Sequence, residues 1–516
     1  MNRLGRHRSV LVLLGLGLAF RLVLALVLFP GQGLSSDLGF FESWATTLGR
    51  VGPGAFYASA GSANYPPGYM YVLWLVDAIS GLFGTSSSHA LVLLLKIPAI
   101  AADIALAAVL YAAARRWFGG RAGLLAAAIY LFIPVTWYDS ALWGQVDAVG
   151  TLVMVTAIVL LVEGWSEPAA ALGAFSLLIK PQDAICLVII VPVLVRRHLL
   201  RVGSGPTVTL GPRLVALNRR LGGLLTDQGP TRLATALAAA ALAAIVPLIP
   251  FDISRFAPAS LADVPVIGQV AGLIGLFVSD GGQFSVLTAN AYNAWAVVGD
   301  HPLASIIGGS GGSWTPDSLL VIGGLHAVTL GAIMLAGLGL VVAGGLVLRA
   351  DRLAIVLGFT LVAFAFYALP TRVHERYLFP LFGSGALLAA GAARWAWGYL
   401  GLGLLNTVNL HAVLAATSSV GQGAGQGGGR GFGGGPGPGG GIAPGGGAGG
   451  GIGGVRDGVS SISLPFADLA RSEPVVIAVA VGQTLLFVAM LAGWIVVAFG
   501  PSLSARLGRK DSLATA

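Results

Sequence analysis

The chain has 516 residues, of which 56% are hydrophobic and only 10% are charged. This composition and the mean hydropathy of +0.86 exclude a water-soluble globule, which needs more charge to cover its surface. The net charge of +8 could suggest nucleic-acid binding, but the basic residues form short clusters beside apolar runs, as in cytoplasmic loops. We therefore predict an all-α, multi-pass membrane protein in contact with the lipid bilayer, with no nucleic-acid partner.

The first predicted element is a retained transmembrane span over about residues 9–30. The basic start MNRLGRHR favours a cytoplasmic N-terminus, and the run lacks a clear small-x-small signal-peptide cleavage site. The stretch SSDLGFFESW then places Asp37 and Glu42 outside, at the mouth of the helix. A carboxylate beside a bilayer is costly unless water, a partner or a substrate compensates it. Asp37 is therefore either a general base for an acceptor hydroxyl, or a helix cap or partner of Arg50.

The next apolar segment, residues 66–84, is only marginally long enough to cross the membrane. Treated as a helix in the outer interface, it keeps the basic loop 115–121 in the cytoplasm, and its Tyr, Trp and Pro residues suit that position. The NYPPGYMY stretch that leads into it carries Tyr65, whose ring could stack on a sugar or simply lie at headgroup depth.

With this choice, the basic loops fall on the cytoplasmic side along the rest of the chain. Spans are predicted at 90–113, 122–136, 147–163 and 168–180, in one segment before the arginine-rich loop 196–232, at 232–250, and in five later segments ending with 474–499. The total is about 12. Nearly every polar or aromatic cluster that interrupts the apolar pattern then lies on the exterior face, and such a one-sided collection indicates a site.

Two exterior motifs in the first half of the chain carry candidate side chains. In WYDSALWGQVDA, Trp143 and Gln145 are suited to sugar recognition, whereas Asp139 and Asp147 alone make a weak metal site. Lys180, in KPQ, lies at a helix break and could reach an anionic group or simply extend to the interface.

Inside the predicted span 90–113, Lys96 and Asp103 are seven residues apart on one helix face. They most simply compensate each other or pair with neighbouring spans. A phosphate-binding role for Lys96 is the alternative.

The late motif RVHERY contains Arg372, His374, Glu375 and Arg376. On the exterior face it runs against the positive-inside bias, and arginine forks with a histidine suit a phosphate or diphosphate. The earlier stretch TANAYNAWAVVG adds Asn293, whose amide is a further candidate for binding sugar or acceptor.

A glycine-rich stretch within residues 421–454 cannot bury enough apolar surface to offset its ordering entropy. It predicts three parts: a transmembrane catalytic bundle over 1–416, a flexible exterior linker over 417–472, and a terminal helix with a basic cytoplasmic tail over 473–516. The single cysteine, Cys186, excludes an intramolecular disulfide.

An acid shortly after the first span, YPPGY before a juxtamembrane helix, WGQVDA, KPQ and a late HERYLFP, in this order, resemble the GT-C superfamily of integral-membrane glycosyltransferases. The similarity covers roughly residues 10–395. It is closest to a bacterial branch related to the glucosyltransferases that extend the lipid-linked N-glycan precursor, and to mannosyltransferases of the same superfamily. The glycine-rich linker and the final span depart from the common pattern.

The resemblance implies a GT-C-like bundle with interfacial helices in its first exterior loop. It also implies transfer of a hexose, mannose or glucose, from a polyprenyl-phosphate carrier to a lipid-linked glycan, polysaccharide or protein acceptor, outside the plasma (inner) membrane. Asp37 matches the family's catalytic acid, and His374, Glu375 and Arg376 match a motif associated with the donor phosphate. No cofactor is expected to be required, although some members use a divalent metal.

Combined with the residues themselves, this gives the full set of candidates. Asp37 is the catalytic base; the donor-phosphate residues are Arg372, His374, Arg376 and Lys180; the sugar or acceptor residues are Glu42, Tyr65, Trp143, Gln145, Asp147, Asn293 and Glu375. A membrane transporter or lipid flippase of envelope precursors is the alternative function, but it predicts paired halves and interrupted helices, and no internal repeat is evident. A non-enzymatic envelope assembly protein is a third possibility.

Overall fold

The computed structural model describes residues 3–61, 63–82, 88–202, 212–220, 223, 226, 228–282, 284–298, 315–423, 462 and 464–506. This part of the chain is helical, and its β-type pairing is confined to isolated bridges. Most of the glycine-rich linker and the tail after residue 506 lie outside the described residues. The division of the chain at 416 and 472 therefore stays a prediction.

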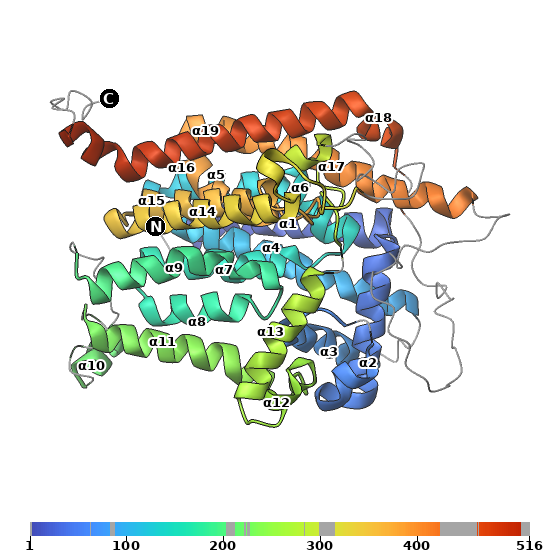
Figure 1. Ribbon diagram of the computed structural model, residues 1–516, viewed down its shortest axis with the longest axis horizontal. Helices are drawn as coiled ribbons and strands as arrows, with labels where there is room; N and C mark the ends of the chain where they lie inside the picture. The colour runs from blue at the N-terminus through green and yellow to red at the C-terminus, as the bar shows by residue number, and fades with distance from the viewer. Residues whose placement is uncertain are drawn as a thin grey trace.

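Most helices run side by side along the long axis of the molecule (Figure 1). They are α1 (Arg3–Leu22), α4 (Ser88–Phe118), α5 (Gly120–Phe132), α7 (Asp147–Val162), α8 (Ser166–Ser176), α9 (Leu187–Leu194), α11 (Pro230–Ile245), α14 (Ala327–Leu348), α15 (Arg352–Ala368), α16 (Phe379–Gly391), α17 (Ala393–Gly423) and α19 (Glu473–Arg506). Shorter α-helices are α6 (Pro134–Trp137), α10 (Pro212–Arg220), α12 (Ala259–Ala262) and α18 (Ala467–Arg471). Non-α turns that matter below are the π-helices η2 (Tyr138–Trp143) and η4 (Val195–Leu199) and the 3₁₀ helices η3 (Pro181–Cys186) and η7 (Ala294–Val297).

Five helices among the described residues are long and apolar enough to cross a membrane, or six if the bent pair 120–132 and 134–143 is one broken span. The five are Arg8–Leu28, Ala90–Phe118, Pro230–Leu248, Ala327–Leu348 and Glu473–Gly500. Shorter apolar helices, including α7, α15 and α16, pack among them. The prediction of a helical, multi-pass membrane protein is confirmed, whereas the count of about 12 spans is not.

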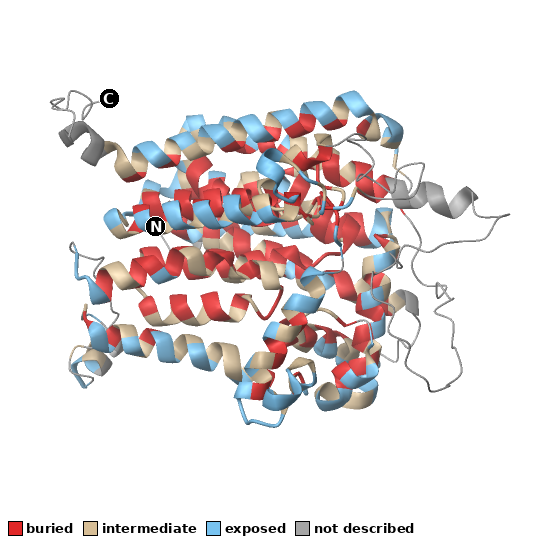
Figure 2. Ribbon diagram, viewed as in Figure 1, coloured by how far each residue is buried: buried red, intermediate tan, exposed pale blue. Residues whose placement is uncertain are grey.

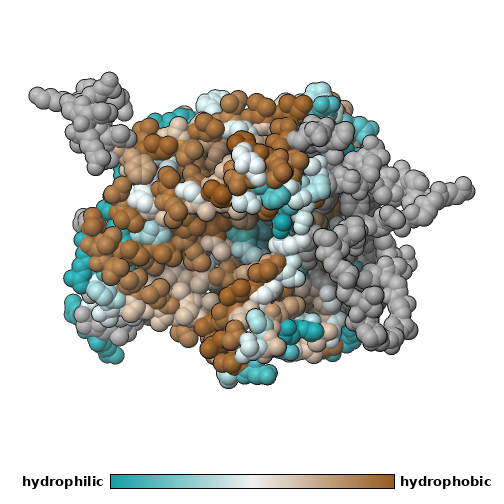
Figure 3. All heavy atoms as spheres, in the orientation of Figure 1, coloured by the Kyte–Doolittle hydropathy of each residue, from teal (hydrophilic) through white to brown (hydrophobic). Residues whose placement is uncertain are grey.

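The outer surface of the bundle is apolar. On the face that Figure 3 shows, hydrophobic side chains cover much of the surface between the two ends of the bundle. Figure 2 shows that buried residues are concentrated in the central helices of the bundle. Leu340 on α14 is 74% exposed and Val496 on α19 is 68% exposed. Such broad exposure of large aliphatic side chains is what a bilayer covers.

The segment after α1 folds into two helices, α2 (Ser35–Ser59) and α3 (Pro67–Leu82), and α13 (Ile267–Gly281) lies near them. α2 runs across one end of the bundle, at the right of Figure 1. The helix expected at 66–84 is α3. These elements share their own apolar core, which includes Phe41, Trp44 and Phe251, so the loop is a packed platform over the bundle end.

Arginines gather at the opposite end of the bundle. Arg116 forms an ion pair with Glu163 at the end of α7, and Arg197 on η4 donates to the carbonyl oxygen of Leu161. Arg349 reaches the carbonyl oxygen of Val497, and Arg232 pairs with Glu167. Because cytoplasmic ends of spans carry most of the Arg and Lys, this arrangement supports a cytoplasmic arginine end and an exterior α2 end.

A buried ion pair joins α1 to α4. Arg21 Nε donates to Asp103 Oδ2 at 2.8 Å, and Tyr130 and Ser140 each donate to the same carboxylate at 2.6 Å. Arg21 and Asp103 are both fully buried. The sequence left two interpretations open: that Asp103 and Lys96 compensate each other, or that they pair with neighbouring spans. Asp103 pairs with a neighbouring helix.

Replacing Asp103 with Asn is expected to lower the free energy of unfolding by about 3–5 kcal/mol, because it leaves Arg21 as an uncompensated buried charge. The thermal unfolding midpoint of the purified protein in detergent measures the effect. Asp263→Asn, at an exposed position, serves as the control and should leave the midpoint unchanged. Equal midpoints for Asp103→Asn and the wild type would show that the pair adds nothing.

Candidate functional site

Asp37 lies in the first turn of α2, where the helix dipole favours a negative charge. Its carboxylate is half-buried. Oδ2 accepts hydrogen bonds from Trp143 Nε1 at 2.9 Å and from Gln145 Nε2 at 2.5 Å. Because both bonds use Oδ2, the other carboxylate oxygen is left able to accept a proton from a bound molecule.

The turn that brings Trp143 and Gln145 together depends on a glycine. The π-helix η2 ends at Trp143, and Gly144 follows with φ 86°, a left-handed conformation that side chains disfavour. A Cβ on Gly144 would also lie only 2.7 Å from Leu38 Cδ2. This glycine thus lets residues 143 and 145 both face Asp37 while α2 packs directly on the turn.

Two cations flank Asp147 beside this turn. Lys180 Nζ lies 2.7 Å from Asp147 Oδ1 and 3.3 Å from Gln145 Oε1. Arg376 Nε lies 3.7 Å from Asp147 Oδ2, and its guanidinium carbon is 5.8 Å from the centre of the Trp143 ring. These contacts connect six residues from four separate parts of the chain, which we call the Asp37 cluster: Asp37, Trp143, Gln145, Asp147, Lys180 and Arg376.

Tyr65 borders the Asp37 cluster. The Lys180 ammonium lies 5.4 Å from the centre of its ring, and the ring packs against Trp44 and Phe41 of α2. The YPPGY stretch is anchored here because Gly68 N donates to the carbonyl oxygen of Leu178 at 2.7 Å. A Cβ at Gly68 would lie 2.5 Å from that oxygen, so this close approach also requires glycine.

The HERY turn places two titratable groups, His374 and Glu375, beside Arg376. Glu375 Oε1 accepts from Arg376 NH1 at 2.8 Å, and His374 Nδ1 is 3.9 Å from Glu375 Oε2. Burial by itself would lower the pKa of Arg376, but the charges of Asp37 and Glu375 outweigh it and hold that pKa above its usual range. Burial raises the pKa of Glu375, although Arg376 opposes the shift. The guanidinium is therefore a fixed positive charge in this cluster.

Burial, together with Arg376 and Lys180, holds the pKa of His374 well below its ordinary value of 6.5. The folded protein therefore keeps this imidazole neutral at pH values where the unfolded chain binds a proton. Its contribution to stability is fully present above pH 6.5 and is lost as the pH falls below that value.

His374→Gln should remove this dependence. The free energy of unfolding of the wild type is expected to fall relative to that of the variant by about 1.4 kcal/mol for each pH unit below 6.5. Unfolding in detergent between pH 5 and 7.5 measures the difference between the two proteins, which cancels the opposite titration of Glu375. Parallel profiles for the two proteins would contradict a neutral, buried His374.

Of the predicted site residues that are not in the Asp37 cluster, Tyr65, His374 and Glu375 adjoin it, and three others lie apart from it. Arg372 Nε pairs with Asp317 Oδ2 at 2.5 Å, and its NH1 donates to the carbonyl oxygen of Gly281. Asn293 caps η7 and donates to the carbonyl oxygen of Tyr367. Glu42 is buried on α2 and makes no hydrogen bond or ion pair with the cluster residues.

Lys96 binds the backbone of two segments next to the Asp37 cluster. Its buried ammonium donates to the carbonyl oxygens of Gln32, Ala141 and Leu142 at 2.5, 2.9 and 3.0 Å. These three carbonyls belong to the loop that leads into α2, the helix of Asp37, and to the end of η2, which carries Trp143. Lys96 therefore holds both sides of the site together, a role that its sequence context did not indicate because backbone acceptors leave no pattern.

Sequence reasoning also missed Asp317 and Asp280. Asp317 holds the loop of Arg372, and Asp280 Oδ1 accepts from Asn64 Nδ2 at 2.7 Å, which ties α13 to the YPPGY entry. The only available signal was an isolated acid in a mostly apolar stretch.

The described residues do not fit a divalent metal. None of their His, Cys, Asp and Glu side chains form a group of three or more able to hold an ion. The two acids of the Asp37 cluster face cations or N–H donors, and a metal would have to displace Lys180 and Arg376 from Asp147. The same arrangement brings two cations, Lys180 and Arg376, to one carboxylate, and cations of this kind bind phosphates.

A protein family matches the part of the chain that carries most of the Asp37 cluster. Residues 64–210 match a family described as dolichyl-phosphate-mannose-protein mannosyltransferase. The resemblance to the GT-C superfamily is confirmed. The matched segment contains Tyr65, Trp143, Gln145, Asp147 and Lys180, whereas Asp37 and Arg376 lie outside it. The contacts above join those two residues to it.

The chain is also similar in structure to an oligosaccharyltransferase from Archaeoglobus fulgidus. The form tethered to an acceptor peptide gives a TM-score of 0.39 at 13% identity, covering 93% of this chain and 56% of that one. The form with an inhibitory peptide and a dolichol-phosphate gives 0.40 at 12% identity, covering 94% and 56%. The chain thus spans little more than half the length of each of these proteins. No curated protein matches the chain.

Proposed function

We propose that this protein is a glycosyltransferase that moves a hexose, mannose or glucose, from a polyprenyl-phosphate carrier to an acceptor hydroxyl at the exterior face of the plasma membrane. The observation that carries the proposal is the contact of Trp143 with both an acid and a cation. Its indole N–H binds Asp37, and its ring lies under Arg376. A carboxylate that can act as a base and a cation that can bind an anion thus contact the same side chain.

The proposed chemistry is a single displacement at the anomeric carbon of the sugar. Asp37 takes the proton of the acceptor hydroxyl while the acceptor oxygen forms the new bond to that carbon. The bond from the carbon to the phosphate oxygen breaks, and its electron pair stays on the phosphate. Arg376 and Lys180 offset the negative charge that develops there.

The remaining cluster residues position the reactants. Gln145 and Trp143 fix the orientation of the Asp37 carboxylate, and Asp147 and Glu375 orient the two cations. Tyr65 offers an aromatic face beside Lys180, where a sugar ring could stack. The description of the matched family, a mannosyltransferase that uses dolichyl-phosphate-mannose, supports a lipid monophosphate as the sugar carrier.

The test supplies the purified protein with polyprenyl-phosphate mannose and polyprenyl-phosphate glucose, each labelled in the sugar, together with membrane extract as a source of acceptors. We expect one of the two labels to move to an acceptor, with release of polyprenyl phosphate, and no label to move from a nucleotide sugar. A donor that crosses a proteoliposome membrane intact would instead indicate a transporter or flippase and overturn the proposal.

A further inference from the structure

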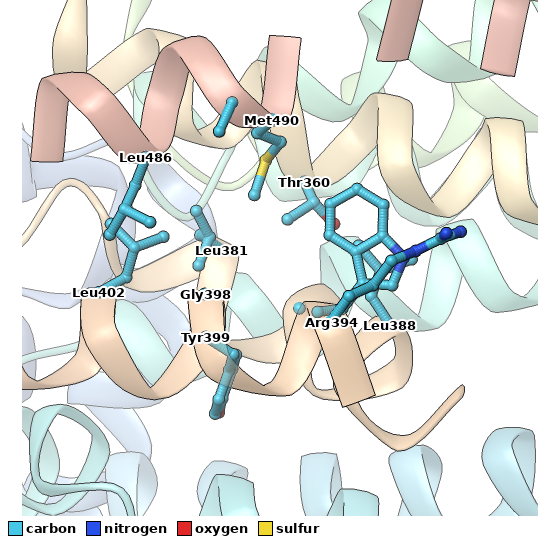
Figure 4. A pocket seen from close by; sticks show the side chains of 12 residues that line it. Thr360, Leu381, Leu388, Arg394, Gly398, Tyr399, Leu402, Leu486 and Met490 are labelled. Carbon is cyan, nitrogen blue, oxygen red and sulfur yellow. The ribbon is translucent and has the colours of Figure 1, made fainter. Parts of the chain in front are cut away.

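Two neighbouring cavities lie away from the Asp37 cluster. The inner one, of about 210 Å³, lies between α15, α16, α17 and α19 and is mainly apolar. Figure 4 shows its lining, which includes Leu381, Leu402, Leu486 and Met490. The second, of about 430 Å³, lies where α4 ends, α15 begins and α16 passes into α17. Leu388, Arg394 and Trp395 line both, so the two cavities adjoin at these residues.

The second cavity lies at the arginine end of the bundle. Arg352 begins α15, and the helix then runs 17 residues to Ala368, just before the HERY turn. At 1.5 Å per residue, the two ends of α15 are roughly 25 Å apart. The second cavity is therefore separate from the proposed catalytic site and lies toward the predicted cytoplasmic leaflet. The inner cavity extends from it along α15 as far as Thr360, about halfway along that helix.

Two arginines without an acidic partner among the described residues line the second cavity. Arg352 lies 5.2 Å from the centre of the Trp117 ring, and Arg394 lies 5.7 Å from the centre of the Trp395 ring. Both arginines are exposed. The acid that lines the same cavity, Asp351, is paired with Arg349 at 2.5 Å. The mouth thus carries net positive charge next to an apolar interior.

We propose that the two cavities bind an anionic glycerophospholipid of the cytoplasmic leaflet. Arg394 and Arg352 hold its phosphate, the two tryptophans lie at headgroup depth, and one acyl chain enters the inner cavity against Leu486 and Met490 of α19. Anionic headgroups are attracted to basic pockets between helices on this side of a membrane. Because α19 forms one wall, the lipid would fill the joint between the bundle and the terminal helix that departs from the GT-C pattern.

The test measures lipid retention by the full chain. The protein is purified from nanodiscs that contain equal amounts of phosphatidylglycerol and phosphatidylcholine, and native mass spectrometry counts the lipids that remain bound. Arg394→Gln removes one charge, and we expect phosphatidylglycerol retention to fall about fivefold. Gly398→Leu fills the inner cavity, because no atom lies within 4 Å of a Cβ at this position, and it should reduce bound lipid of both kinds.

Matched controls come from the same chain. Arg255 is an exposed arginine whose guanidinium carbon lies 5.9 Å from the centre of the adjacent Phe256 ring. It belongs to the predicted exterior loop and does not line either cavity. Gly337 lies on the outside of α14, also with no atom within 4 Å of a Cβ. Arg255→Gln and Gly337→Leu should retain lipid as the wild type does.

Unchanged retention in both cavity variants would overturn the proposal, as would an equal loss in the control variants. Retention of polyprenyl phosphate in place of phosphatidylglycerol, in a competition between the two, would also overturn it and would assign the cavities to the carrier. None of these outcomes depends on sugar transfer, so the lipid site and the proposed catalytic activity are tested separately.

Discussion

Replacing Asp37 with Asn is expected to lower the kcat of sugar transfer by about 10²–10⁴-fold and to leave the protein folded. Asn has the same shape, and its side-chain oxygen can still accept from Trp143 and Gln145, the two donors that hold Asp37 in the wild type. The amide cannot take the acceptor's proton, so the loss falls on the chemical step. Initial rates with the preferred labelled donor measure it.

The matched control is Asp252→Asn. Asp252 is an exposed acid between α11 and α13, next to Phe251, which packs in the same platform as α2. It should transfer sugar at the wild-type rate. A wild-type kcat for Asp37→Asn would remove Asp37 as the base, and a similar loss in both variants would show that the effect is not specific to the cluster.

The second large effect is expected at Arg376. Arg376→Ala should raise the KM for the lipid-phosphate donor by about 10- to 100-fold, which corresponds to the loss of one charge-assisted hydrogen bond of about 1.5–3 kcal/mol. It should also lower the free energy of unfolding, because Asp147 and Glu375 lose a buried counter-charge. Arg376→Lys keeps the charge but not the planar fork, so its KM should lie between those of the wild type and the alanine variant.

Arg372→Ala is the comparison that separates the two arginines of the same turn. Arg372 pairs with Asp317 outside the Asp37 cluster, so its loss should disturb the loop but change the donor KM by less than about threefold. Steady-state kinetics at varied donor concentration, together with unfolding midpoints, distinguish the variants. An equal rise in KM for both alanine variants would show that the positive charge of the whole turn, rather than Arg376, binds the donor.

The sequence was sufficient to predict the class of protein and several members of the cluster. Charged and amide side chains in apolar surroundings are costly, so Asp37, Lys180 and Arg376 stand out from the residues near them. The positive-inside bias then predicts that all three lie on one face of the membrane. Their gathering into one cluster follows from that single argument about charge and sidedness.

The contacts within the cluster could not be predicted in the same way. Asp37 and Trp143 are 106 residues apart, and no local pattern states that the indole N–H reaches that carboxylate. Arg372 and Arg376 look alike in the sequence, yet Arg372 adopts φ 65° and its side chain pairs with Asp317, while Arg376 lies over Trp143. A left-handed backbone conformation at an arginine depends on tertiary packing rather than on residue type.

Short helices limited the prediction of spans. α9 has eight residues, includes Pro192 and continues into the π-helix η4, so no single regular run of membrane length marks it. Lys96 shows the same limit for charges: its three acceptors are backbone carbonyls, which any residue supplies.

The proposed function requires that the Asp37 cluster faces the outside of the cell while the arginine end faces the cytoplasm. Cysteine accessibility tests this directly, because the only native cysteine, Cys186, is buried. In intact cells, a membrane-impermeant maleimide should label Ser36→Cys and Arg372→Cys, and should label Arg116→Cys only after the membrane is opened. Labelling of positions 36 and 372 from opposite sides, or of both from the cytoplasm alone, would contradict an extracytoplasmic sugar-transfer site.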